Sequence, residues 1–282
     1  MTSIPKIAFQ GAPGANSHEA CRDYFPGYEA APYLTFEEAF EAVKGGECAL
    51  GMIPVENSIA GRVGDVHHLL PSSGLRIVGE KFKPIRFQLM ANSGVKLEDI
   101  TVVSSMPIAL HQCRRSLKKL GVATEAAGDT AGAARTLAQY PDPTRGAIAP
   151  ALAAEIYGLD ILLRDIEDER HNTTRFLVMT ADPSPPPPAF TERCITSFCF
   201  RVKNIPAALY KAMGGFATNS VNMTKLESYM EGGAFTATFF YAEVDGRPED
   251  RGLALALEEL AFFSEEIQIL GVFPADPFRD RV

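Results

Sequence analysis

Short apolar runs alternate with amphipathic segments over the first two thirds of the chain. The apolar runs have the length of buried strands, and they cover residues 6–11, 49–55, 100–105, 146–149 and 174–179. The segments between them have apolar residues at helical spacing, and they cover residues 35–43, 107–120, 131–139 and 151–157. Strands that alternate with helices usually form a parallel sheet covered by those helices. The pattern therefore predicts an α/β fold for this part of the chain.

Two of the predicted helices begin with recognisable start signals. Thr35 is followed three residues later by Glu38, which is the spacing of a capping box. Pro107 stands where the second helix would begin, and proline suits the first turn because its missing N–H group is not needed there. Ligands of α/β folds bind at the carboxyl ends of the strands, so polar residues that follow strands are the first candidates for a site.

The last third of the chain has a different order of elements. Strands are predicted at residues 195–202, 222–229, 235–244 and 266–273, and helices at residues 206–214 and 248–263. The resulting order, βαββαβ, is that of a ferredoxin-like α+β domain. The strands mix apolar and polar residues, as expected of a sheet that is covered on one face.

A proline-rich segment separates these two parts. Asp182 is followed by the sequence PSPPPP. Proline cannot donate a backbone hydrogen bond and favours the extended polyproline conformation, so such a run acts as a semi-rigid spacer. We therefore expect a first domain over residues 1–182, a linker over residues 183–189 and a second domain over residues 190–282.

Charge and composition narrow the class of partner. The 282 residues suffice for two domains, and 27 basic against 35 acidic residues give a net charge of −8. This balance argues against nucleic acid, which requires a basic face, but one or two arginines in a cleft could still bind a small anion. No secretion signal and no apolar run of bilayer length is found in the sequence, so we expect a cytoplasmic protein that does not contact membranes.

Cysteines and histidines give no sign of a metal site. The 5 cysteines contain no CxxC pair, which suggests free thiols in a reducing compartment. The 5 histidines do not pair with a second ligand at a spacing typical of metal sites. We therefore expect neither a metal nor an organic cofactor.

The first candidate motif follows a predicted strand and is Glu56-Asn57-Ser58, within PVENSIAGRV at residues 54–63. Asn57 and Ser58 are good N-caps for a helix that would contain His67 and Leu70. The backbone amides at such a helix start could also bind a carboxylate. Taken alone, the motif favours the simpler interpretation of a capped helix.

The second candidate motif is Asn-Thr-Thr-Arg-Phe, which follows an acidic loop and opens an apolar strand. Arg175 could bind a carboxylate through its two-pronged guanidinium. Alternatively, it forms an ion pair with an acidic residue of the loop, namely Asp165, Glu167, Asp168 or Glu169. Thr174 could donate a hydrogen bond to a departing oxygen, or it could be an ordinary strand threonine.

The third candidate segment, residues 10–18, leads from a strand into a helix through small residues. Gly11 and its neighbours would let a ligand approach the backbone, and Ser17 could contact that ligand. The alternative is a plain turn in which Ser17 or Asn16 caps the helix. Glycine-containing loops are weak evidence by themselves.

In combination these motifs resemble the prephenate dehydratase family. The resemblance rests on PVENSIAGRV at 54–63, GAIAPALAAEIYGLDILLRDIED at 146–168 and NTTRFLV at 172–178, and it extends over nearly the whole chain. It implies a catalytic domain with the two-lobed α/β fold of periplasmic binding proteins and an active site between the lobes. It also implies the decarboxylative dehydration of prephenate to phenylpyruvate in phenylalanine biosynthesis, without a cofactor.

The resemblance assigns roles to residues of the first two motifs and to one glutamine. The family's essential threonine falls on Thr174, which we expect to be catalytic, with Glu56 as the alternative proton donor. A family glutamine that precedes a cysteine falls on Gln112, although this residue could instead be an exposed helix position. The expected substrate-binding residues are Asn57, Ser58, Arg175, Phe176, Gln112, Gly11 and Ser17.

One departure from the family lies just upstream of Gln112. The family often has Ser-His-Pro-Gln-Ala-Leu where this chain has SMPIAL at residues 105–110. The histidine and the first glutamine are therefore missing, which removes any role for those two side chains but leaves Gln112 in place.

The last third of the chain resembles an ACT domain, a ferredoxin-like module that binds amino acids at subunit interfaces. IPAAL at 205–209 stands where the family has Gly-Ala-Leu, and NMTKLESYM at 222–230 stands where it has a strand ending in Glu-Ser-Arg-Pro. Ala207 replaces the glycine, and Tyr229-Met230 replaces Arg-Pro. The residues expected to bind phenylalanine are Ala207, Ala208, Leu209, Asn222, Met223, Leu226, Glu227 and Ser228.

This second resemblance implies allosteric inhibition by phenylalanine in a homodimer or homotetramer, whereas the simpler alternative is a domain that only dimerises. Two alternatives to the main function stay open. One is an arogenate dehydratase, which performs the same elimination on the amino-acid analogue. The other is a non-catalytic small-molecule binding protein fused to an amino-acid sensor. A fused chorismate mutase is not expected.

Overall fold

The computed structural model describes residues 4–189, 193–230 and 237–281. The chain forms two compact units: Met1–His67 with Lys81–Leu177, and His68–Glu80 with Val178–Val282. This division differs from the expected one because residues 68–80 belong with the C-terminal part. The reason lies in backbone packing, since Gly271 approaches Ile77 so closely that a Cβ atom would overlap the Ile77 carbonyl oxygen. None of the described helices combines the length and apolar character that a bilayer crossing requires.

The first lobe is built on a six-stranded sheet with the order β2-β1-β3-β11-β5, in which the short β4 pairs with β3. β1 runs parallel to both β2 and β3. The strands are β1 (Lys6–Gln10), β2 (Glu29–Tyr33), β3 (Leu50–Asn57), β4 (Gly61–Arg62), β5 (Arg76–Pro84) and β11 (Thr173–Thr180). The accompanying helices are α1 (Asn16–Tyr24), α2 (Phe36–Lys44) and α3 (Gly64–Leu69), followed by a 3-10 turn at Leu70–Ser72.

Apolar residues of these strands form the core of the first lobe, because Ile7, Phe9 and Ile53 have no exposed surface. The predicted cap of α2 is confirmed: Thr35 Oγ1 accepts a hydrogen bond from the Glu38 amide at 3.2 Å. This bond satisfies one of the backbone N–H groups that a helix start leaves without a partner.

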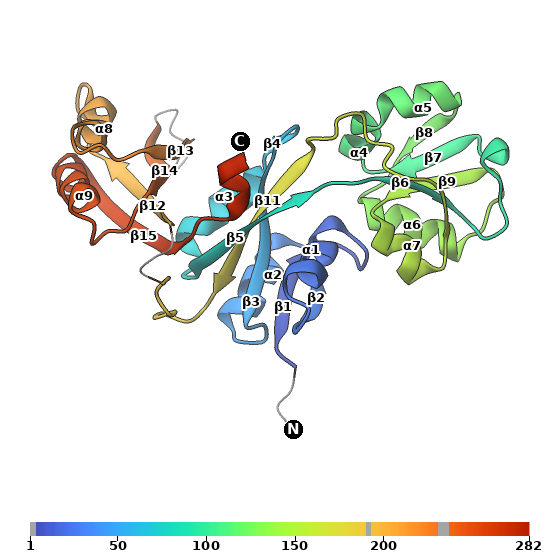
Figure 1. The fold of residues 1–282 in the computed structure, drawn as a ribbon, viewed down its shortest axis with the longest axis horizontal. Helices are drawn as coiled ribbons and strands as arrows, with labels where there is room; N and C mark the ends of the chain where they lie inside the picture. Colours follow the sequence, from blue (N-terminus) through green and yellow to red (C-terminus); the bar gives the residue numbers. More distant parts are fainter. Residues whose placement is uncertain (1–3, 190–192, 231–236, 282) are drawn as a thin grey trace. The chain divides into compact units, whose positions relative to one another are not determined.

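The second lobe contains a five-stranded sheet with the order β10-β6-β9-β7-β8. Its strands are β6 (Gln88–Ala91), β7 (Val102–Ser105), β8 (Ala123–Ala126), β9 (Arg145–Ala149) and β10 (Asp160–Leu163). Its helices are α4 (Pro107–Gln112), α5 (Arg114–Leu120), α6 (Thr130–Gln139) and α7 (Ala151–Tyr157), with a 3-10 turn at Leu97–Asp99. Figure 1 shows α6 and α7 side by side on one side of this sheet. The two-lobed α/β fold is therefore confirmed.

Two details of the first unit differ from the sequence prediction. The sheets are mixed rather than all parallel, because β6 pairs antiparallel with both β9 and β10. The predicted helix at residues 107–120 is two helices that meet at Cys113, whose φ of −110° and ψ of 13° are not helical.

The second unit carries a four-stranded sheet with the order β13-β14-β12-β15, and all its pairings are antiparallel. Its elements are β12 (Cys194–Val202), α8 (Ala208–Thr218), β13 (Met223–Met230), β14 (Ala237–Asp245), α9 (Arg251–Phe263), β15 (Ser264–Pro274) and a 3-10 helix at Pro277–Arg281. The helices α8 and α9 lie together (Figure 1), and their apolar residues share one core with Phe198, Phe200 and Phe240 of the sheet. The βαββαβ order is as predicted, although residues 235 and 236 of the expected third strand lie outside the described residues.

Ala207, at the N-cap of α8, has a left-handed backbone conformation with φ of 60°. A side chain makes this conformation unfavourable, whereas glycine adopts it readily. We expect Ala207→Gly to raise the free energy of unfolding by about 1 kcal/mol, measured from the urea midpoint at unchanged slope. The neighbouring Ala208→Gly, inside the helix, should lower it by roughly 0.5–1 kcal/mol. A loss of stability in Ala207→Gly would mean that this backbone conformation is not strained.

Candidate active site

The first two candidate motifs meet where β3 and β11 run side by side. The Ser58 amide donates to the Thr173 carbonyl oxygen at 2.9 Å, and the Thr173 amide donates to Ser58 Oγ at 3.0 Å. Ser58 Oγ in turn donates to the His171 carbonyl oxygen at 3.0 Å. These bonds join two segments that lie 115 residues apart in the sequence. The hydroxyl of Ser58 therefore holds the two motifs together.

Asn57 is the centre of a side-chain network. Its Nδ2 atom donates to Asn172 Oδ1 at 2.8 Å and to Thr174 Oγ1 at 3.0 Å. Its Oδ1 atom accepts from the amides of Ile59 and Ala60 at 3.0 and 2.8 Å. Because both ends of the amide are engaged, only one orientation of the side chain satisfies the network.

The predicted role of Asn57 and Ser58 as helix caps is wrong. The helix α3 begins at Gly64, and the residues between form a hairpin in which β4 pairs with β3. Asn57 itself binds the amides of this turn, as asparagine commonly does. Two of the amides proposed to hold a carboxylate are therefore already occupied by Asn57 Oδ1.

Thr174 is positioned as a hydrogen-bond donor. Its side chain is 9% exposed, and its Oγ1 atom accepts the bond from Asn57. A hydroxyl has one proton to donate in addition to its acceptor capacity. Within the described parts of the chain, no acceptor is found for that proton. It is therefore available for an oxygen atom of a bound molecule.

Gln112 is connected to Thr174 through the side-chain amides of Asn172 and Asn57. Its Oε1 atom accepts from Asn172 Nδ2 at 3.0 Å, and Asn172 Oδ1 accepts from Asn57. Gln112 is only 8% exposed, so the alternative of an exposed helix position is wrong. The network therefore runs from the end of α4 in the second lobe to β3 and β11 in the first.

Asn172 belongs to this network, although no role was predicted for it from the sequence. It has no exposed surface and connects Gln112 to Asn57. The only signal was its position two residues before Thr174 in the Asn-Thr-Thr-Arg motif. Its contacts depend on the packing of two lobes, which no local pattern describes.

Arg175 forms an ion pair with Glu56. The distance from Nη1 to Glu56 Oε1 is 3.0 Å, and the arginine side chain is 3% exposed whereas the glutamate side chain is 33% exposed. The guanidinium also lies 5.8 Å from the ring centre of Phe82. A carboxylate on one side and an aromatic ring nearby hold the guanidinium in a defined orientation.

The predicted alternative partners of Arg175 are wrong. The acidic residues of the loop at 165–169 interact with Arg86, Gln88 and Arg115 instead. The Arg115 guanidinium lies 2.7 Å from Glu169, and the Arg115 backbone amide donates to Asp168 Oδ2 at 2.9 Å. Arg86 pairs with Glu167 at 3.3 Å, and Asp165 accepts from the Gln88 side chain at 3.2 Å.

The loop that contains Gly11 and Ser17 contributes to the joint between the lobes. The hydroxyl of Tyr157, at the end of α7, donates to the Pro13 carbonyl oxygen at 2.7 Å. Gly14 packs closely against Ala153 of α7. A Cβ atom added to Gly14 would lie 2.8 Å from the Cα atom of Ala153. No hydrogen bond between described residues connects Gly11 or Ser17 to the Asn57 network, so their binding roles stay predictions.

The His18 side chain stabilises the conformation of this loop. Its Nδ1 atom accepts from the Gly14 amide at 3.0 Å, and its ring stacks on Phe9 with 5.1 Å between ring centres. Burial, assisted by the nearby Arg22, lowers the pKa of His18 below its usual value. Only the neutral imidazole has a lone pair at Nδ1 that can accept the hydrogen bond from the Gly14 amide.

The remaining predicted site residues are Phe176 and the residues expected to bind phenylalanine, and none of them belongs to the Asn57 network. Phe176 is 1% exposed and lies in the protein interior, so its contact with a substrate stays a prediction. Leu209, near the start of α8, and Met223, on the edge strand β13, pack against the same apolar core of the second unit. Ala207 and Ala208 begin α8, and Asn222, Leu226, Glu227 and Ser228 lie just before or on β13.

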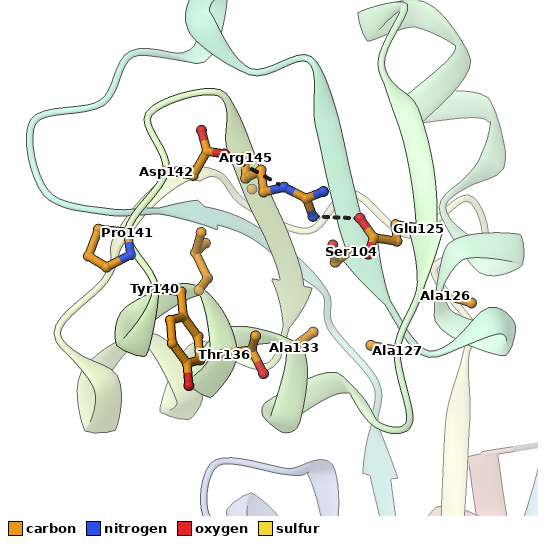
Figure 2. Close-up of a pocket in the computed structure, with 12 residues that line it drawn as sticks. Ser104, Glu125, Ala126, Ala127, Ala133, Thr136, Tyr140, Pro141, Asp142 and Arg145 are labelled. Carbon is orange, nitrogen blue, oxygen red and sulfur yellow. Dashed lines mark hydrogen bonds and ion pairs between the residues drawn. The ribbon is translucent and has the colours of Figure 1, made fainter.

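A cavity of about 670 Å³ in the second lobe contains none of the predicted site residues. It lies between α6 and the strands β7, β8 and β9. Two of its lining residues, Arg145 and Glu125, form an ion pair at 2.5 Å. Figure 2 marks this pair with a dashed line. In the described parts of the chain, no group of three or more His, Cys, Asp or Glu side chains could hold a metal ion.

Comparison with known proteins agrees with the motifs. The prephenate dehydratase family model matches residues 7–184. The chain is 49% identical over 276 residues to a bifunctional N-acyl-homoserine lactone acylase/prephenate dehydratase of Komagataeibacter europaeus, with 97% of both chains covered. It is 37% identical over 285 residues to arogenate dehydratase 2 of Petunia hybrida, covering 96% of this chain and 72% of that protein.

A solved structure is similar to this chain over most of the length of both proteins. The prephenate dehydratase of Arthrobacter aurescens in complex with L-Phe has a TM-score of 0.86 at 29% identity, covering 96% of this chain and 90% of that one. The family match includes Asn57, Gln112, Asn172 and Thr174, the four residues of the hydrogen-bonded network. The chain belongs to the prephenate dehydratase family.

Proposed function

We propose that this protein converts prephenate to phenylpyruvate, carbon dioxide and water. The observation that supports this most is the network from Gln112 through Asn172 and Asn57 to Thr174. In this network the Thr174 hydroxyl accepts from Asn57, and no described residue accepts its proton. The ion-paired Arg175 follows directly in the sequence and provides a cation for a carboxylate.

The reaction requires stabilisation of a departing hydroxide. The bond between the ring and the carboxylate that leaves as carbon dioxide breaks, and its electron pair completes the aromatic ring as the C–O bond breaks. Negative charge develops on the departing oxygen, which takes up a proton to become water. A donor that is already in position at that oxygen lowers the barrier without any reorganisation. We assign this role to the Thr174 hydroxyl.

Threonine is a very weak acid, so Thr174 acts by donating a hydrogen bond or by relaying a proton. Asn57 stabilises this arrangement because it occupies an acceptor site on Oγ1 and directs the proton outward. Gln112 and Asn172 act one step further away as positioning residues. Ser58 is also a positioning residue, since its hydroxyl bonds to the backbone of the second motif.

Arg175 binds a substrate carboxylate in this proposal, and Glu56 orients it. A carboxylate 3.0 Å from the guanidinium keeps the planar group aligned for two parallel hydrogen bonds. The same pairing supports Glu56 as an orienting group rather than the proton donor, because a protonated Glu56 would give up its charged partner. Anchoring the substrate in the geometry from which carbon dioxide leaves contributes the remaining catalysis.

The direct test is incubation of the purified full-length chain with prephenate and, separately, with arogenate. Products are separated by chromatography and identified by mass, with protein-free samples as the control. We expect phenylpyruvate from prephenate at a rate far above the control. Faster turnover of arogenate would assign the alternative, which the similarity to a Petunia arogenate dehydratase supports. Turnover of neither substrate would contradict the proposed function.

Hydrolysis of N-acyl-homoserine lactones is a second candidate activity. It is supported by the 49% identity to a protein described as both an acylase and a prephenate dehydratase. A cysteine nucleophile is disfavoured, because all five thiols are buried and burial raises the pKa of Cys21 and Cys199 to about 12. The test is release of the fatty acid from an N-acyl-homoserine lactone, and an unchanged lactone after prolonged incubation would exclude this activity.

We further propose the division into a catalytic domain, residues 1–182, and an ACT domain, residues 190–282, that binds phenylalanine in a homodimer or homotetramer. The ferredoxin-like order of the second unit and the similarity to a structure described with L-Phe support this assignment. Inhibition requires that phenylalanine bind the less active arrangement better, and a coupling of about 1–3 kcal/mol is typical.

The regulatory assignment predicts a selective effect of Leu226→Lys. Leu226 lies on the edge strand β13 and is 41% exposed, so the variant should fold. We expect phenylalanine to inhibit it about tenfold more weakly, at unchanged kcat, because a buried apolar contact typically contributes about 1.5–3 kcal/mol. Leu255→Lys on α9 is the matched control, since Leu255 is also 41% exposed. Equal loss of inhibition in both variants would contradict the assignment.

A further inference from the structure

A cavity of about 290 Å³ lies under the proline-rich segment, entirely within the second unit. The prolines at residues 183 and 185–188 line one wall. The opposite wall is formed by residues of β5 and β15, namely Arg76, Ile77, Ile269, Gly271 and Val272. Arg247 and Glu249 complete the lining. The cavity shares no residue with the network around Asn57 or with the residues expected to bind phenylalanine.

The walls of this cavity are held in place by specific contacts. Arg247 donates to the Pro188 carbonyl oxygen at 3.0 Å and also to that of Ala189, which ties the end of the proline-rich segment to the sheet. On the other wall, Gly271 of β15 rests on the backbone of Ile77. Successive prolines restrict the backbone strongly, so this wall needs little further ordering to bind a ligand.

Arg76 gives the cavity a positive group without a carboxylate partner. Its Nη1 atom donates to the Ile269 carbonyl oxygen at 2.6 Å. No ion pair between Arg76 and an acidic residue is found in the described part of the chain. A guanidinium has five N–H donors, and a partly buried charge is stabilised when an anion accepts from them. The cavity lining contains two arginines and one acidic residue, the exposed Glu249, so its net charge is positive although the chain carries a net charge of −8.

We propose that this cavity binds a small organic carboxylate with an apolar or aromatic body. The carboxylate accepts hydrogen bonds from Arg76, and the body lies against the proline rings and the side chains of Ile77 and Val272. The volume is at the lower end of the range for small-molecule sites, about 300–1,000 Å³. A monocarboxylate of the size of phenylacetate therefore fits better than a nucleotide or a peptide.

The test uses 4-fluorophenylacetate as the probe and full-length protein, with binding followed by fluorine NMR. We expect Arg76→Gln to weaken binding at least about tenfold, because hydrogen bonds to a charged group are lost. The substituted side chain keeps an N–H donor for the Ile269 carbonyl oxygen. Arg145→Gln is the matched control, since Arg145 also lines a cavity but is already paired with Glu125. Unchanged affinity in Arg76→Gln would overturn the proposal.

A second measurement does not depend on removing the arginine. All five native cysteines are buried, so Ser184→Cys places one accessible thiol on the cavity wall. We expect 4-fluorophenylacetate to slow alkylation of this thiol severalfold, and the neutral 4-fluorophenylacetamide to leave the rate unchanged. Equal protection by acid and amide, or protection by neither, would show that the cavity does not recognise a carboxylate.

Discussion

Replacing Thr174 by alanine is expected to lower kcat for prephenate dehydration about a hundredfold or more. The reason is that the hydroxyl is the donor placed for the departing oxygen, and losing one such donor typically costs a factor of about 10²–10³. KM should change little, because the hydrogen bond to the departing oxygen strengthens mainly in the transition state. Steady-state rates at several prephenate concentrations would separate the two parameters.

Thr174→Ser is the informative companion, because it keeps the hydroxyl and its bond from Asn57. We expect it to retain substantially more activity than the alanine variant. Thr101→Ala serves as a control, since Thr101 is exposed and its hydroxyl donates to the Thr144 carbonyl oxygen within its own lobe. Near-normal activity of Thr174→Ala would show that another group assists the departure of hydroxide.

The motifs predict the composition of the site better than they predict its geometry. Glu56, Asn57, Thr174 and Arg175 all lie at the junction of β3 and β11, as expected of polar residues at strand ends. The helix start predicted at Asn57 was wrong. An asparagine that caps a helix and one that closes a turn offer the same side-chain acceptor to the following amides, so the sequence does not distinguish them.

Long-range partners could not be derived from local patterns. Arg175 pairs with Glu56, 119 residues away, and not with the acidic residues nearest in the sequence. The two residues meet because β3 and β11 are neighbours in one sheet, although the whole second lobe lies between these strands in the sequence. Asn172 was overlooked for the same reason, since both of its side-chain partners come from other segments.

Edge strands were also missed. All four residues of β8 are exposed, so the strand lacks the apolar run that marks a buried strand. β2 has no buried residue either. By contrast, the βαββαβ order of the second unit was evident from sequence because its strands are longer and carry apolar residues on the face covered by α8 and α9.

The proposed roles of Glu56 and Arg175 lead to a prediction with two variants. Arg175→Lys keeps a positive charge beside Glu56 but loses the planar two-pronged donor. We expect kcat/KM to fall about 10–150-fold, mainly through KM, because hydrogen bonds to a charged group contribute about 1.5–3 kcal/mol. Melting temperatures should show that the variant folds, since lysine can still pair with the carboxylate.

Glu56→Gln tests whether this residue orients Arg175 or supplies the proton. An orienting role predicts a loss in kcat/KM of the same kind as in Arg175→Lys, with kcat retained within about tenfold. It also predicts that the double variant is little worse than either single one, because both changes break the same pair. A proton donor would instead contribute about 10²–10⁴-fold to the rate, and its removal would eliminate one limb of the pH–rate profile. If Glu56→Gln abolishes turnover while Thr174→Ala stays active, Glu56 is the acid and Thr174 only helps to position the substrate.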